Sequence, residues 1–209
     1  MLVNPAVIAF IVFLVVYFLG TEGAKRYYDM RIQAFISTGL YDEAFCDLNR
    51  FLPRILFTTY QQHKYRFFVH EGRGERELAE RMLELMLRMR NSAKRQAEID
   101  ALAFNYYAQA GNRKRAKELL ADLKAVKGAD RAVIADCQLT YDIVCGHRHD
   151  MIDKMESLLP NANDAQKGKL YFLLAKQYAN AGNKERARAY RARFDELKAA
   201  QRPQAPAEG

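Results

Sequence analysis

The chain has 209 residues, enough for one or two ordinary domains, and a hydrophobic share of 50%, enough to build a core. Five prolines, no tryptophan and abundant Ala, Leu, Arg, Lys and Glu favour helix over sheet. Three cysteines without framework spacing indicate free thiols and argue against a disulfide-stapled protein. The net charge of +8 suits good solubility, attraction to an anionic membrane, or nucleic-acid binding.

The first predicted element is an apolar helix at the N-terminus. Leu2 to Gly20 carries no charge. At about 1.5 Å per residue this run would span roughly 28 Å, close to the thickness of a hydrocarbon core. Residues 1–22 are therefore predicted to be a transmembrane anchor, with a cleaved signal peptide and a buried core helix as the alternatives. Because Lys25 and Arg26 follow the run, the positive-inside rule predicts a single-pass membrane protein whose C-terminal body is cytoplasmic.

The body of the chain, residues 25–198, is organised around a glycine that recurs at intervals of 35, 37, 35 and 36 residues. The recurring positions are Gly39, Gly74, Gly111, Gly146 and Gly182. The clearest copy, Tyr106–Leu120, has the pattern of one helix ending, a tight turn, and a second helix beginning. A period in the mid-thirties predicts stacked helical hairpins, because one hairpin cannot bury its apolar face alone. Residues 199–209 are polar and are predicted to be a disordered tail.

Each turn glycine is predicted to provide a left-handed residue, and a small residue five positions later allows close helix approach. That later residue is alanine in the first, second, third and fifth copies, and it is Met151 in the fourth copy. The fifth copy is the most complete, with Tyr171, Leu174, Ala175, Tyr178, Gly182, Ala187 and Phe194. In this arrangement it resembles the tetratricopeptide repeat (TPR), a helix–turn–helix of about 34 residues.

The copies depart from the TPR pattern to different degrees. The third has Asp100 where a large apolar residue is usual, and the fourth has Asp142 at the usual aromatic position. Together with the apolar N-terminus, the resemblance predicts an all-α protein. It would consist of one N-terminal transmembrane helix followed by an α-solenoid of about five TPR-like helix hairpins.

The resemblance implies a right-handed superhelix whose first helices line a concave groove that binds peptides or partner proteins. Carried over by position, the peptide-binding residues would be Gln33, Lys64, Phe68, Asn105, Gln109, Lys169, Phe172 and Lys176. This mixed and partly basic lining suits an extended or acidic segment. For any one of these residues, plain solvent exposure is the simpler interpretation.

Catalytic and metal chemistry find little support in the sequence. It contains no Gly-rich phosphate loop, nucleophile elbow or paired carboxylates, so no enzymatic activity, catalytic residue or cofactor is predicted. Cys145, His147 and His149 surround one turn glycine without a second ligand pair, which favours an ordinary exposed turn over a metal site. The basic residues 184–198 are predicted to form a capping helix, with RNA phosphates or anionic lipid as alternative contacts.

These observations predict a membrane-anchored, non-enzymatic scaffold or adaptor that binds a protein or peptide partner through its groove. One alternative is a basic solenoid that binds nucleic acid or anionic lipid head groups, with nucleic acid the less favoured partner. A second alternative is an accessory subunit of a membrane complex that uses the anchor for assembly.

Overall fold

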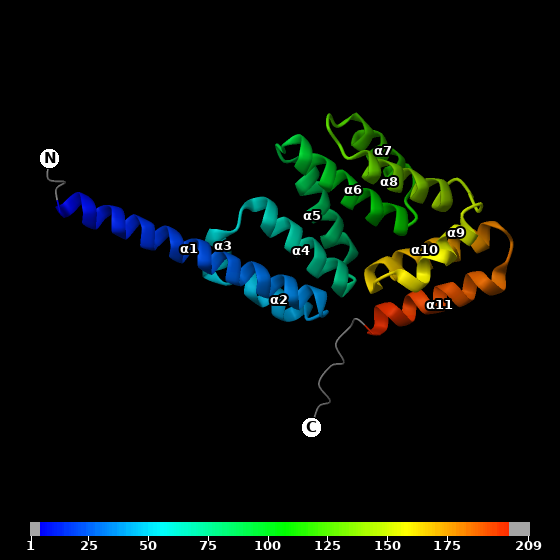
Figure 1. Ribbon diagram of the computed structural model, residues 1–209, viewed down its shortest axis with the longest axis horizontal. Helices are drawn as coiled ribbons and strands as arrows, with labels where there is room; N and C mark the ends of the chain where they lie inside the picture. Colours follow the sequence, from blue (N-terminus) through cyan, green and yellow to red (C-terminus); the bar gives the residue numbers. More distant parts are fainter. Residues whose placement is uncertain (1–4, 201–209) are drawn as a thin grey trace, which may run out of the picture. The chain divides into compact units, whose positions relative to one another are not determined.

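The computed structural model describes residues 5–200, apart from the side chains of residues 5, 6, 8 and 9. Over this range the chain is all-helical and repeat-like, with eleven α-helices, one 3₁₀ turn and no strand (Figure 1). The predicted helical class is confirmed. The chain divides into two compact units, one ending at Met86 and one beginning at Leu87. Most of the predicted tail lies outside the described residues, and residues 199 and 200 belong to the last helix.

The first unit has a small core between the C-terminal part of its first helix and the helices that follow. Its elements are α1 (Pro5–Ser37), α2 (Tyr41–Leu48), α3 (Phe51–Leu56), α4 (Thr59–Arg73) and α5 (Arg76–Arg88), the last of which runs across the boundary. The core consists of Ile32, Ala44, Leu48, Phe57, Tyr65 and Val69. Ala44 is fully buried, as its position five residues after a turn glycine predicts.

The N-terminal part of α1 requires a correction. Its side chains from Phe10 to Leu19 are 45–66% exposed, and the same helix then carries Glu22, Lys25 and Arg26. Among the described residues, no helix is both long and apolar enough to cross a membrane. The predicted transmembrane anchor over residues 1–22, and with it the single-pass localisation, is wrong. Residues 1–4 of that segment lie outside the described part.

The second unit is a stack of three hairpins. Its elements are α6 (Ala93–Gln109), α7 (Arg113–Ala125), α8 (Arg131–Val144), α9 (Ile152–Leu158), η1 (Leu159–Asn161), α10 (Asp164–Asn180) and α11 (Lys184–Ala200). The first helices α6, α8 and α10 pack in succession, α7 packs on α6 and α8, and α11 packs on α10. This order of contacts is the one that tandem hairpins require.

The turn of the fourth hairpin differs from the others. The left-handed glycines, with φ between 76° and 79°, include Gly39, Gly74, Gly111 and Gly182. In the fourth hairpin the left-handed residue is His147, with φ 61°, so the prediction of a left-handed Gly146 is wrong. Gly146 is required for another reason, because a Cβ there would lie 2.7 Å from the carbonyl oxygen of Asp142.

α6 contains a buried carboxylate. Asp100 is 1% exposed, and the Nε2 atom of Gln96 donates to its Oδ1 at 2.8 Å. Its Oδ2 has no hydrogen-bond partner within the described residues. Burial raises the pKa of Asp100, and the bond from Gln96 only partly opposes this change. Ionised Asp100 therefore destabilises the folded unit.

Asp100→Asn should stabilise the protein, because asparagine keeps an acceptor for Gln96 and removes the buried charge. We expect the free energy of unfolding at pH 7 to rise by about 1 kcal/mol in urea titrations. Since the folded pKa of Asp100 is raised, its ionisation reduces stability as the pH rises from the unfolded value of 3.8. The advantage of the variant should therefore shrink below that pH.

The control for this prediction is Glu98→Gln, which removes an exposed carboxylate from the same helix and should be neutral. A wild-type protein that is more stable than Asp100→Asn at pH 7 would contradict the assignment of a destabilising charge.

Candidate functional site

A pocket of about 380 Å³ lies in the second unit between α8, α9, η1 and α10. Its wall is mostly apolar and includes Leu139, Met151, Met155, Leu158, Leu170 and Leu173. Its polar lining residues are Asp136, Lys154, Asn161, Gln166 and Lys169. A concave, mainly apolar surface with a few polar groups is the usual form of a binding site.

The second helix of the fourth hairpin, which forms one wall of the pocket, is short. α9 has 7 residues, whereas α7 has 13 and α11 has 17. It ends at Leu158, directly before the 3₁₀ turn that contains Pro160. Within the described chain α9 packs against α10 and makes no comparable contact with α8. The pocket lies between α9 and α8.

Two polar side chains of α10 hold the start of α9 and the turn before it. The Oε1 atom of Gln177, which is fully buried, accepts from the backbone N–H of Met151 at 2.9 Å. Its Nε2 atom donates to the sulfur of Met155 at 3.1 Å. The Nδ2 atom of Asn180 donates to the carbonyl oxygens of Ile143 at 2.8 Å and Arg148 at 3.0 Å. These bonds fix α9 to α10.

A second attachment lies on another face of α9, at Glu156. Its Oε1 accepts from the hydroxyl groups of Tyr178 and Tyr190, each at 2.7 Å, and from Arg186 at 3.2 Å. The pKa of Glu156 is lowered, mainly by the hydrogen bond from Tyr178. The two tyrosine rings are stacked, with centroids 5.6 Å apart and an interplanar angle of 8°. Glu156 thus joins α9 to α10 and α11.

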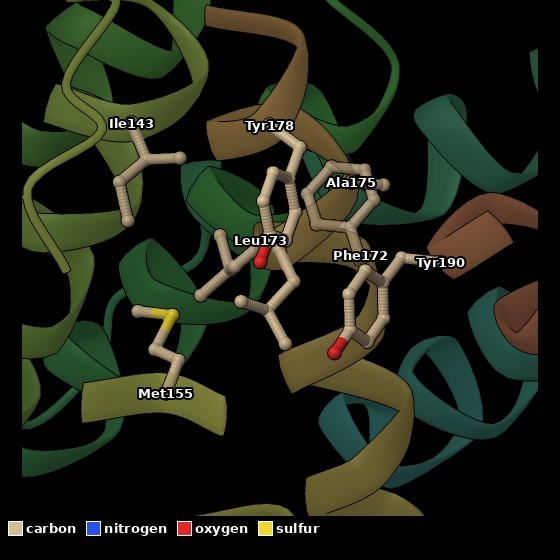
Figure 2. Close-up of a cluster of buried hydrophobic side chains, with 8 residues drawn as sticks. Ile143, Met155, Phe172, Leu173, Ala175, Tyr178 and Tyr190 are labelled. Atoms are coloured by element: carbon tan, nitrogen blue, oxygen red, sulfur yellow. The ribbon is translucent and has the colours of Figure 1, made fainter. Parts of the chain in front are cut away.

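The pocket wall is continuous with the hydrophobic core of the last two hairpins. Figure 2 shows Leu173 in the middle of this core, near Met155 on one side and Tyr178 on the other. Leu173 is 2% exposed and Met155 5% exposed, and both also line the pocket. The floor of the pocket is therefore packed into the core rather than formed by loops.

The predicted groove residues of the first unit occupy α1 and α4. The Nε2 atom of Gln33 donates to Asp29 at 3.0 Å and to the hydroxyl of Tyr65 at 3.1 Å. Lys64 and Phe68 are half-buried on α4. Gln33 is thereby engaged in contacts within the unit.

The other five predicted residues lie in the second unit, and only Lys169 lines the pocket. Asn105 donates to the carbonyl oxygen of Ala101 at 2.9 Å, and Gln109 is exposed at the end of α6. Lys176 is exposed, with its Nζ 5.9 Å from the Phe172 ring. The Phe172 side chain is 7% exposed and belongs to the core.

Apart from Lys169, no residue of the pocket was predicted from the sequence to bind a ligand. Two signals pointed to an irregular fourth hairpin: Met151 in place of alanine, and Pro160 only nine positions later. Neither reveals a pocket, because its existence depends on which neighbour α9 packs against.

The cysteine and histidine residues near this turn do not form a ligand set. The Nδ1 atom of His149 lies 3.3 Å from the carbonyl oxygen of His147. In the part of the chain that the structure describes, no group of three His, Cys, Asp or Glu side chains is placed to hold a metal ion. Cys137 is buried, and burial raises its pKa to about 11, so its thiol is protonated at neutral pH.

Comparisons with protein-family models, with curated proteins and with solved structures found no match to this chain. The TPR resemblance therefore stays a prediction, and the site itself has to indicate the function.

Gln177→Leu tests the attachment of α9. Leucine has a similar volume but cannot bind the Met151 N–H, so we expect a loss of about 1 to 2 kcal/mol in the free energy of unfolding. Amide hydrogen exchange in α9 should become faster at the same time.

Gln109→Leu, at an exposed position, is the control and should change the free energy of unfolding by less than about 0.5 kcal/mol. Unaltered exchange in α9 of Gln177→Leu would show that this glutamine does not hold the helix.

Proposed function

We propose that this protein is a non-enzymatic helical-repeat protein that binds a segment of a partner protein, with one side chain of that segment in the pocket beside α9. The observation that supports this most is the mainly apolar pocket between α8, α9, η1 and α10. Its volume of about 380 Å³ suits one large side chain and its backbone neighbours better than a large cofactor.

The chemistry of the pocket supports binding rather than catalysis. Its charged lining consists of the Asp136–Lys169 ion pair and Lys154, and it contains no cysteine, serine or histidine that could act as a nucleophile or general base. Met151 and Met155 provide flexible, polarisable contacts that adapt to the shape of an inserted side chain.

The basic pattern of α11 has an explanation within the fold, so it supports no second function. The guanidinium group of Arg186 lies 5.5 Å from the Tyr178 ring and 3.2 Å from Glu156. Arg193 lies 5.2 Å from the ring of Tyr190. The alternation of basic and aromatic residues therefore serves cation–π packing of the last hairpin.

Photocrosslinking in native cells tests the proposal. A photoreactive amino acid replaces Leu158, which lines the pocket and is 51% exposed. We expect it to form a reproducible adduct with a partner protein. Ala162→Trp, which fills the pocket from the loop after η1, should reduce the adduct by about tenfold, as expected for a loss of about 1.4 kcal/mol in binding.

The matched control is Ala165→Trp, an exposed position on α10 that does not line the pocket. It should leave the adduct intact. The proposal fails if Leu158 gives no adduct, or if both tryptophan variants affect the adduct equally.

A further inference from the structure

The charges around the pocket are unbalanced. The ammonium group of Lys169 is paired with the carboxylate of Asp136. Lys154, on α9, lines the same pocket, and its ammonium group has no carboxylate partner among the described residues. The lining thus has two positive charges and one negative charge.

Asp153, directly before Lys154, is exposed and forms no ion pair with it. Two other acidic residues that lie near Lys154 in the sequence are already engaged. Asp150, four positions earlier, pairs with Arg148, whose Nε lies 2.5 Å from its Oδ1. Glu156, two positions later, accepts hydrogen bonds from two tyrosines and Arg186. Asp150 and Glu156 are engaged elsewhere and Asp153 does not pair with Lys154, so a ligand in the pocket meets a cation at its edge that has no ion-pair partner among the described residues.

An ammonium group beside an apolar wall favours a ligand that combines apolar and acidic groups. When a side chain fills the pocket, water leaves the wall next to Lys154, and the lower local dielectric strengthens an ion pair there. A carboxylate on the ligand would gain from this pairing, whereas a ligand cation would be repelled.

We infer that the pocket recognises an acidic protein segment, in which a large apolar side chain enters between α8 and α9 and a nearby Asp or Glu pairs with Lys154. This inference rests on the proposed function and specifies its ligand. Nucleic acid fits the same features poorly, because the pocket lining includes no aromatic side chain on which a base could stack.

Peptide selection tests the inference. A random twelve-residue peptide library would be displayed on phage and selected against the full-length chain. Enriched peptides should share a large apolar residue with Asp or Glu within four positions. In fluorescence anisotropy, Lys154→Glu should weaken their binding at least about tenfold. Substituting Lys for the acidic residue of the peptide should restore binding to Lys154→Glu, which a misfolded variant could not achieve.

Two control variants locate the binding surface. Lys176→Glu changes an exposed lysine of α10 outside the pocket and should reduce affinity by less than about threefold, an effect of surface charge alone. Ala162→Trp should weaken binding by about tenfold, because it occupies the space of the apolar side chain.

The outcomes separate this inference from the proposed function. If peptides lose binding in Ala162→Trp but tolerate Lys154→Glu, the acidic specificity is overturned while the function stands. If no peptide is enriched, or if enriched peptides bind Ala162→Trp as well as wild type, both are overturned. Millimolar octanoate could displace the peptides where an acidic peptide that lacks the apolar residue does not. That result would indicate a small amphiphile as the ligand and would overturn the inference of an acidic protein segment.

Discussion

The attachment of α9 to α10, rather than to its own hairpin partner α8, is the contact on which the candidate site depends. Gln177 forms hydrogen bonds with the Met151 N–H and the Met155 sulfur. Glu156 accepts hydrogen bonds from one tyrosine hydroxyl of α10 and one of α11. Each such bond contributes about 1 kcal/mol, and Gln177 would be costly to bury without its partners. A helix of 7 residues is not stable alone, so these bonds and the packing of Met155 into the core hold α9 in place. The pocket is the space that this arrangement leaves beside α8.

The same arrangement explains why the fourth hairpin departs from the others. Where a repeat has a small residue five positions after its turn glycine, the two helices approach closely, and Ala116 in the third hairpin is fully buried. Met151 is too large for that role, and it lines the pocket instead. A stack of similar hairpins can tolerate one such irregularity because each hairpin depends only on its neighbours. The irregular hairpin gains an accessible apolar surface at little cost to the rest of the unit.

The predictable part of this structure is the part that local chemistry determines. Recurring glycines located the hairpins, and the alanines Ala44 and Ala116 were correctly expected at close helix contacts. The candidate site was not predictable, because it depends on long-range pairing such as that between Gln177 and Met151, 26 residues apart. Phe172 was placed in a groove by analogy of position, but its ring packs on Phe194 in the core. The anchor predicted at the N-terminus was wrong, because no helix among the described residues is long and apolar enough to cross a membrane.

The central claim is that the space beside α9 is open and accepts an apolar side chain. Methionine-methyl NMR with N-acetyl-leucinamide, a simple mimic of an inserted leucine, tests this most directly. The account predicts saturable shifts at Met151 and Met155, which line the pocket, and only small, linear shifts at Met30, which is 66% exposed on α1. Equal and non-saturating shifts at all three methionines would contradict it, because they would show that the space beside α9 has no more affinity for leucine than the ordinary protein surface.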